Sequence, residues 1–308
     1  MMTTDFFANQ DFKFADNNRK ASDKTKFAFT VDVEEWFQVG AFESTFQRSE
    51  WGGLESRVEI QTEQILKLLS TLGITGTFFS LGWVAERFPE LLREIVSAGH
   101  ELACHGMDHR RLFTMTRQEF SADLIKAKDL LEQCSGSAVN GYRAPSFSLT
   151  PDVWWVYDEL SKADFKYSSS LYPVKTDHYG AQEAPRVPFL PIGDCNILEI
   201  PMTVCDVPFI RLPASGGGYF RLLPYFFSRY LMASGSEQSR SPGIFYMHPW
   251  EMDLGQPYIK KAPLLSRFRH YSGQAGLPAK LKRLSKSFSW SSIEDVFGPY
   301  LSCQDGSI

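Results

Sequence analysis

The sequence contains few cysteines, no long apolar run and no block of basic residues. Its five cysteines are widely spaced and odd in number, which does not suit a disulfide framework and favours a reducing, cytoplasmic setting. No apolar run reaches the roughly 18–20 residues that span a bilayer, and residues 1–26 lack the apolar core of a secretory signal. The net charge of −4, without a basic block, disfavours nucleic acid as a partner and a polybasic membrane anchor.

The apolar and aromatic residues are sufficient for a large core, and the order of the predicted elements indicates an α/β fold. Apolar residues make up 43% and aromatic residues 14% of the 308 residues, a length at which α/β barrels commonly fold as one unit. Predicted strands alternate with predicted helices along the chain, which indicates a parallel α/β architecture of barrel-like form. The strands are predicted at 26–33, 75–82, 100–104, 165–170, 196–202 and 243–248, and the best-defined helix at 116–136, where Thr116 and Glu119 form a capping box.

Three segments depart from this alternation. Residues 204–241 read as an insertion or rim element, residues 1–25 as a flexible arm or loosely docked strand, and residues 299–308 as a polar tail. The glycines of "SGGGYF" within the insertion have two interpretations: a flexible turn, or a backbone that a glycan approaches closely.

Polar residues gather where the predicted strands end. Asp32 and Glu34 end the first strand, His105 and His109 follow the third, Arg143 follows the segment 138–142, and His248 follows the last. In parallel α/β folds the carboxyl ends of the strands meet at one rim, where functional side chains collect. We therefore expect these residues to converge on a single site.

The pair of histidines in "HGMDH" has two interpretations. His105 and His109 are either metal ligands or ordinary polar residues at a strand end, and their spacing alone does not decide between them. With Asp32 and Glu34 on one strand face beside them, a carboxylate and two histidines would leave room for water on an ion, as in catalytic rather than structural zinc sites.

Three further stretches suit the chemistry of such a site. In "GYRAPSF", Arg143 can hold Asp32 ionised, and Ser146 supplies the first backbone N–H after Pro145, a candidate donor to an oxyanion. In "FYMHPWE", His248 can protonate a leaving group, or it is simply a satisfied histidine at a strand end. Trp250 is either a core residue or an apolar platform for a sugar face.

These stretches resemble the polysaccharide deacetylases of the NodB-homology group (carbohydrate esterase family 4), and within it the subgroup linked to exosortase-associated exopolysaccharide systems. The resemblance covers residues 27–297 and rests on "FTVDVEEWFQV", "TFFSLGWVAERFPEL", "GHELACHGMDHR", "GYRAPSFSLT", "GGGYFRLLPY", "FYMHPWEMD" and "FRHY". It implies a distorted (β/α)7-type barrel, with residues 26–298 as the catalytic domain.

The resemblance also implies roles for the rim residues. Asp32 matches the catalytic base, His105 and His109 the paired metal ligands, Arg143 the arginine that steadies the base, and His248 the general acid. The divalent ion is expected to be Zn²⁺, with Co²⁺, Mn²⁺, Fe²⁺ and Ni²⁺ as alternatives. Trp36, Phe147, Tyr219 and Trp250 are the predicted glycan-contacting residues.

The sequence departs from the family pattern at two places. Glu34 stands where relatives place a metal-binding aspartate, and Glu35 follows it directly, so the choice between them stays open. Ser168 stands where relatives carry the aspartate that orients the acid; Glu199 is the candidate substitute for it, or else a structural acid.

Three functions are compatible with these residues. The first is hydrolysis of N-acetyl groups on amino sugars of an exopolysaccharide or its precursor, by a cytoplasmic enzyme that associates peripherally with a synthesis assembly at the inner membrane. The second keeps the fold and metal but opens a cyclic amide or imide. The third is a non-catalytic glycan-binding component, which the combined presence of base, metal set and acid argues against.

Overall fold

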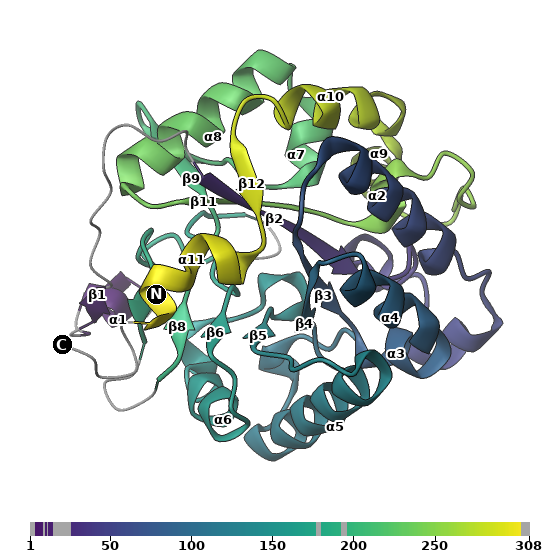
Figure 1. Ribbon diagram of the computed structural model, residues 1–308, viewed down its shortest axis with the longest axis horizontal. Coiled ribbons are helices and arrows are strands. Elements are labelled where there is room, and N and C mark those ends of the chain that lie inside the picture. The colour runs from purple at the N-terminus through teal and green to yellow at the C-terminus, as the bar shows by residue number, and fades with distance from the viewer. Residues whose placement is uncertain are drawn as a thin grey trace.

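The computed structural model describes residues 4–8, 10, 12–14, 26–176, 180–191 and 196–302, and its central feature is a mainly parallel sheet (Figure 1). Parallel pairing runs in the order β11–β2–β3–β4–β5–β6–β8, β12 also pairs with β2, and β7 and β1 continue the sheet antiparallel beyond β8. The predicted parallel α/β architecture is confirmed. The strands are β2 (Lys26–Val33), β3 (Thr77–Ser80), β4 (Glu101–Cys104), β5 (Gly141–Tyr142), β6 (Tyr167–Ser168), β7 (Phe189–Leu190), β8 (Leu198–Glu199), β11 (Gly243–Met247) and β12 (Ser289–Ser291).

Helices cover the outside of this sheet. Apolar residues of α2, α4 and α5 fill an outer core with Phe29, Val31 and Phe78 of the strands. Helix ends follow local rules, since Gly73 ends α2 in the left-handed region and Thr116 caps α5 with Glu119. The helices of this layer are α2 (Val58–Leu72), α3 (Gly82–Arg87), α4 (Pro89–Ser97), α5 (Arg117–Ser135), α6 (Val156–Lys162) and α10 (Leu277–Leu284). Helix α11 (Ile293–Ser302) instead packs its buried side chains into a second core with Ala28 and Phe79.

The other face of the sheet has its own core, and this face carries the polar rim residues. Ala28 of β2, Phe79 of β3, Ala103 of β4 and Ile244 and Tyr246 of β11 form this inner core. Because side chains alternate along a strand, the residues two or four further on face the same side. Asp32, His105 and His248 lie two or four positions after inner-core residues of β2, β4 and β11. Their side chains therefore face the same side of the sheet, at one rim.

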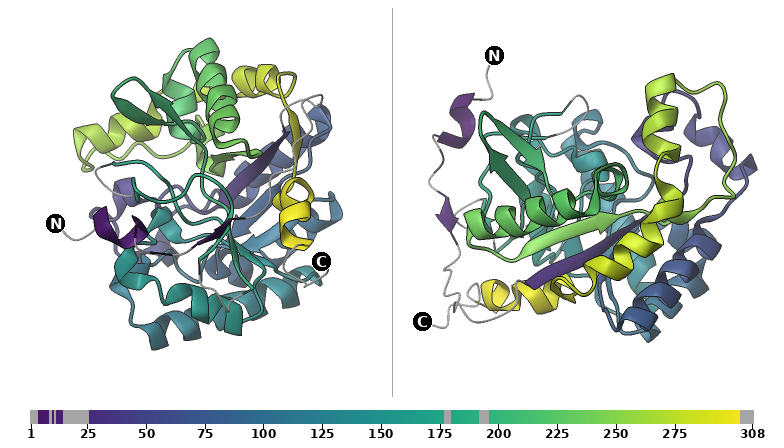
Figure 2. Two further views of the ribbon diagram at one scale, coloured as in Figure 1. Left: turned by 90° about the vertical axis from the view of Figure 1, so that its left-hand side faces the viewer. Right: turned by 90° about the horizontal axis from the view of Figure 1, so that it is seen from above.

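Strands β8 and β11 form no ladder with each other among the described residues, and the segment around 203–216 lies between them. The N–H of Ile244 donates to Thr203 Oγ1 over 2.7 Å, and the N–H of Tyr246 donates to the Ser215 carbonyl over 2.8 Å. The predicted insertion thus contributes a wall beside β11 as well as rim elements (Figure 2). It contains β9 (Val204–Val207), β10 (Ile210–Pro213), α7 (Gly217–Leu222) and α8 (Tyr225–Ser239).

Parts of both predicted terminal segments belong to the folded structure. Helix α1 (Thr4–Ala8) buries Phe7, whose ring contacts Trp154 of the 3-10 turn before α6, and β1 (Lys13–Phe14) pairs with β7. Helix α11 runs to Ser302, past the predicted boundary at residue 298. Residues 15–25 and 303–308 lie outside the described residues. No helix within the described residues is both long and apolar enough to cross a membrane.

Candidate active site

Glu34, His105 and His109 form one buried cluster at the carboxyl ends of β2 and β4. One potential ligand atom from each lies within 4.8 Å of the others. The two histidines meet through a loop rather than a helix, because Gly106 (φ 81°) and His109 (φ 57°) take left-handed conformations that turn the chain back. The predicted set of metal ligands is therefore brought together by the fold.

The donor set of this cluster suits a divalent cation. His105 Nδ1 lies 2.8 Å from the Arg143 carbonyl oxygen, so this nitrogen carries the proton and Nε2 keeps its lone pair toward the cluster. Burial lowers the pKa of His105 to about 4, so the ring is neutral at pH 7. Glu34 Oε2 is buried and accepts no well-aligned hydrogen bond from the described residues, although His109 Nε2 lies 2.8 Å away. A cation would satisfy this oxygen.

The two adjacent glutamates have different partners. Burial alone would raise the pKa of Glu34, but the neighbouring His109 and His248 lower it to about 2. Glu35 points away and accepts hydrogen bonds from the Ser56 hydroxyl and from the N–H groups of Arg57 and Val58 at the start of α2. Glu35 thus caps a helix, and Glu34 is the acid that faces the histidines.

Asp32 is held by a fully buried arginine. Arg143 Nη1 donates to Asp32 Oδ1 over 2.7 Å and to Thr30 Oγ1 over 2.8 Å, and Nε donates to the Ser169 carbonyl over 3.1 Å. The guanidinium also stacks over the Phe79 ring, with 4.1 Å between Cζ and the ring centroid. This set of contacts fixes the rotamer of Asp32 and leaves its Oδ2 facing the site.

His248 lies beside both Asp32 and the cluster of Glu34, His105 and His109. Its Nε2 is 3.5 Å from Glu34 Oε1 and 4.0 Å from Asp32 Oδ2. Its Nδ1 is 2.7 Å from Glu251 Oε1, and Arg221 Nε donates to Glu251 Oε2 over 2.9 Å. Burial alone would lower the pKa of His248, but the charges of Glu34, Glu251 and Asp32 raise it to about 9. The cationic form is therefore favoured at neutral pH.

Of the two alternatives for Glu199, the structural acid is confirmed, and the alternative that it orients His248 is wrong. Glu199 Oε1 accepts hydrogen bonds from the N–H groups of Ser170 and Leu171, and Tyr157 donates to its Oε2 over 3.0 Å, so it ties β8 to the chain after β6. Ser168 donates to Ser170 Oγ. The carboxylate beside His248 comes from Glu251 instead, three residues further along "HPWE", a spacing that places both on one side of the 3-10 turn Pro249–Met252.

Ser146 and Phe147 follow Pro145 in unusual backbone conformations. Ser146 (φ 53°) and Phe147 (φ 48°) are both left-handed, although neither is glycine, and such strained residues collect at functional sites. The N–H of Ser146 donates to no group in the part of the chain that the structure describes. It is therefore available to an oxyanion.

Of the four predicted glycan-contacting residues, Trp36, Phe147 and Trp250 are buried and only Tyr219 is exposed. Trp36 is only 2% exposed and packs against Phe37, Phe42 and Phe46, so this ring offers no face to a sugar. Phe147 is buried against Tyr172 and Tyr246 below Arg143. Tyr219 is 39% exposed on α7 and lines a hollow between α7 and α8.

Trp250 is a core residue rather than an open platform. Its ring stacks between His248, at 5.0 Å between centroids, and His270, at 4.2 Å, and is 7% exposed. Arg221 packs 5.5 Å from the same ring and donates to the carbonyls of Arg269, His270 and Ser272. Glu251, Arg221 and His270 support His248. In the sequence, the H-x-x-E spacing pointed to Glu251, whereas Arg221 and His270 lie in the quoted stretches "GGGYFRLLPY" and "FRHY" without a predicted role.

The glycines of "SGGGYF" make room for the protein's own side chains. A Cβ at Gly217 would collide with the Glu251 carboxylate, and a Cβ at Gly216 would press on the Tyr246 ring. Neither predicted alternative, a flexible turn or close approach of a glycan, is needed to explain them. The glycines let α7 approach the turn that carries Glu251.

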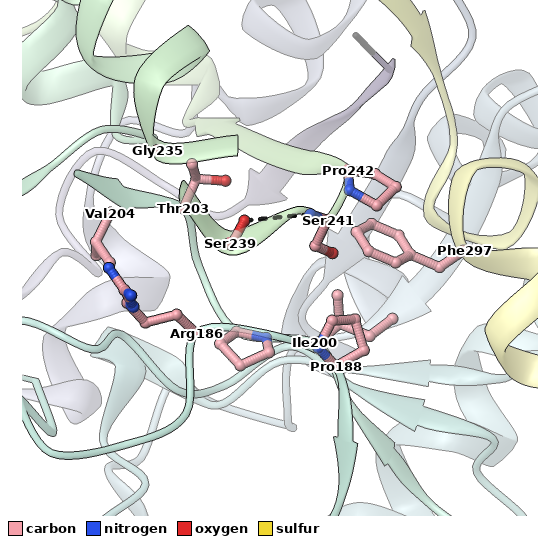
Figure 3. A pocket seen from close by; sticks show the side chains of 11 residues that line it. Arg186, Pro188, Ile200, Thr203, Val204, Gly235, Ser239, Ser241, Pro242 and Phe297 are labelled. Atoms are coloured by element: carbon pink, nitrogen blue, oxygen red, sulfur yellow. Dashed lines mark hydrogen bonds between the residues drawn. The ribbon is translucent and has the colours of Figure 1, made fainter. Parts of the chain in front are cut away.

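The pocket in Figure 3 lies at the other end of β11. Ser241 and Pro242, which line it, precede β11, whereas His248 follows this strand. Phe297 of α11 and Gly235 of α8 complete part of its wall. The pocket therefore lies away from the converged polar residues.

Comparisons with known proteins agree with this geometry. Residues 54–163 match the family model described as polysaccharide deacetylase, and residues 169–298 match a model described as a domain of unknown function. The first match begins after Glu34 and ends before His248. A solved structure from Mycobacterium smegmatis assigned to the polysaccharide deacetylases has a TM-score of 0.62 at 21% identity, with 96% of each chain covered, and shows the same fold.

Two curated relatives match shorter stretches. The peptidoglycan deacetylase of Helicobacter pylori is 33% identical over 118 residues, which are 37% of this chain and 38% of that protein. The chitooligosaccharide deacetylase of Sinorhizobium fredii is 31% identical over 93 residues, 30% of this chain and 43% of that protein. The chain thus spans less than half the length of these relatives.

Proposed function

We propose that this chain is a polysaccharide deacetylase that hydrolyses the N-acetyl amide of an amino sugar within an exopolysaccharide or its precursor. The match of residues 54–163 to the family model described as polysaccharide deacetylase supports this. The observation that supports this most is the convergence of Asp32, His248 and the Glu34–His105–His109 cluster on one rim. A general base, a general acid and a cation site are the three parts that metal-assisted hydrolysis of an unactivated amide uses.

Glu34, His105 and His109 are the residues that would hold a divalent ion, with Zn²⁺ as the first choice because it accepts mixed nitrogen and oxygen ligands. When bound, such an ion acidifies water and polarises the acetamide carbonyl. The buried Glu34 oxygen without a hydrogen-bond donor supports this assignment.

The chain's own residues supply the proton transfers. Asp32, oriented by Arg143, removes a proton from the attacking water through Oδ2. The Ser146 N–H donates to the oxyanion of the tetrahedral intermediate. His248 Nε2 then donates its proton to the amine nitrogen, since an amide nitrogen does not leave as an anion. The C–N bond breaks, and acetate and a free amino sugar result.

The test is acetate release from N-acetylhexosamine oligomers by the purified chain supplied with Zn²⁺ or Co²⁺. We expect acetate from the unaltered chain and a loss on the order of 10² or more in Asp32→Asn, with the metal content retained. An Asp32→Asn protein that purifies without metal would mean that Asp32 is a principal ligand. A chain that binds metal but releases no acetate from any oligomer would refute the proposal.

A cyclic amide or imide is the second candidate substrate, and the burial of the site favours it. Asp32, Glu34 and His105 are each 2% exposed, which suits a small ring that is enclosed during the reaction. Ring opening releases no acetate. Turnover of a cyclic imide is therefore measured by the loss of the ultraviolet absorbance of the imide, and comparison with acetate release separates the two reactions. Association with an exopolysaccharide synthesis assembly and a cytoplasmic location remain parts of the proposal.

A further inference from the structure

Helix α9 (Leu264–Tyr271) and the loop before it expose a group of large apolar side chains. This group, here the α9 surface, consists of Leu254, Tyr258, Leu264, Leu265 and Phe268, each between 56% and 77% exposed. Figure 1 shows α9 and this loop at the edge of the molecule. Five exposed apolar residues within fifteen positions form a patch of the kind that contacts another surface.

The exposure does not result from a poorly anchored helix. His270 on the inner side of α9 is buried and stacks on Trp250, and its Nε2 donates to Gln256 Oε1 over 2.6 Å. Tyr271 donates to the Pro257 carbonyl over 2.6 Å and accepts from the N–H of Ile259, so the loop is fixed to the helix. Apolar residues therefore remain on the outer side of a segment whose inner side is fully packed.

The segment that carries these apolar side chains is rich in basic residues and contains no acidic ones. Between Asp253 and Glu294 the sequence contains no aspartate or glutamate, although the whole chain carries a net charge of −4. Lys260, Lys261 and Arg267 form no ion pair with a carboxylate among the described residues. Lys260 and Lys261 lie in the loop before α9, and Arg267 lies on α9 itself, so all three stand beside the exposed apolar side chains in the chain.

We propose that the α9 surface docks on an anionic lipid membrane, with its leucine and aromatic side chains at the headgroup boundary and its cations facing lipid phosphates. A short amphipathic helix with lysines and arginines beside leucine and phenylalanine binds membranes in this way. A second copy of the chain fits less well, because a two-fold interface would place the same uncompensated cations against each other.

Docking would bring the site to the membrane surface. Trp250 links α9 to the acid, since its ring stacks on His270 of α9 and on His248. A glycan still attached to a lipid carrier would then meet the site, a consequence that rests on the proposed function. The docking itself does not depend on catalysis.

Co-sedimentation of the full chain with vesicles tests the docking. We expect binding to phosphatidylcholine vesicles containing phosphatidylglycerol, and little binding to phosphatidylcholine alone. Lys260→Gln with Lys261→Gln should weaken binding by roughly 25-fold, from about fivefold per cation. Leu264→Ser with Phe268→Ser should weaken it about tenfold or more. Binding should also fall as salt rises from about 0.1 M to about 1 M, because the Debye length shortens from about 10 Å to about 3 Å.

The chain contains a matched control. Phe209 and Ile210 at the tip of the β9–β10 hairpin are 108% and 59% exposed, and Phe209→Ser with Ile210→Ser should leave vesicle binding unchanged. Equal losses in this control, or no binding of the unaltered chain to anionic vesicles, would overturn the proposal. So would a dimer in sedimentation velocity that Leu264→Ser with Phe268→Ser dissociates. Since vesicle binding needs no turnover, an inactive enzyme would leave this result intact.

Discussion

At the scale of single residues, the neighbouring Glu34 and Glu35 show how one position along the chain changes a side chain's role. Glu34 faces His105 and His109, whereas Glu35 caps α2. Glu34→Gln is therefore expected to lose the divalent ion, and Glu35→Gln to keep about one ion per chain while its helix is destabilised by about 1 kcal/mol. Elemental analysis and thermal unfolding of the two variants check this. Loss of metal in Glu35→Gln alone would reverse the assignment.

The contact between His248 and Glu251 leads to a second prediction. Glu251→Gln should lower kcat for the N-acetyl amide about tenfold or more at nearly unchanged KM, because the neutral amide removes a negative charge that favours the protonated form of His248. Turnover of 4-nitrophenyl acetate should change little, since nitrophenolate leaves without a proton. His248→Ala should show the same split between substrates.

The matched control for this prediction is Asp253→Asn. Asp253 lies at the end of the same turn but pairs with Arg57 and Gln61 rather than with His248. The Asp253→Asn variant should have the same ratio of amide turnover to ester turnover as the unaltered chain. If both variants reduce both activities equally, the effect is one of folding, and Glu251 has no separate role in positioning the acid.

At the scale of elements, Glu199 joins β8 to the chain after β6 and makes stability depend on pH. Burial raises the pKa of Glu199 to about 7, although hydrogen bonds from Ser170 and Leu171 oppose this. Between pH 4.5 and pH 7 the folded chain therefore holds a proton that the unfolded chain has released. The free energy of unfolding should fall as pH rises through this window, by at most roughly 1.4 kcal/mol per pH unit for this group.

Glu199→Gln keeps an acceptor for the two N–H groups and removes the titration. Urea unfolding at several pH values should show a flatter decline than in the unaltered chain. Burial also raises the pKa of Glu101 on β4 to about 7, so part of the decline should persist. An unchanged slope in Glu199→Gln would contradict the prediction.

At the scale of the whole molecule, the cation site connects segments that are far apart in the chain. Glu34 follows β2 and the histidines follow β4, so an ion that binds only the folded chain should stabilise the entire fold. At about 100 times the dissociation constant this amounts to about 2.7 kcal/mol, a rise of roughly 4 °C in Tm for a chain of 308 residues. Differential scanning calorimetry with Zn²⁺ and with a chelator measures it. The same rise in Glu34→Gln would show that the ion acts elsewhere.

Local patterns in the sequence determined most of the elements and the direction of the key side chains. Strand β2, the capping box of α5 and the ends of α2 and α4 follow from consecutive residues, because alternation, helical periodicity and capping are properties of neighbours. Once the strands are parallel, their carboxyl ends share a rim, so the convergence of Asp32, His105 and His248 was also predictable.

Only the tertiary structure decided which partners these residues meet. Glu199 sits opposite Tyr157 and Glu251 opposite Arg221, pairs that are distant in sequence and depend on how loops cross the sheet. Burial of Trp36 and exposure of α9 likewise depend on what packs above each segment. A periodic pattern records that a side is apolar, but the arrangement of the other elements determines whether that side is covered, and this is why the core position of Trp36 and the α9 surface could not be derived from the sequence.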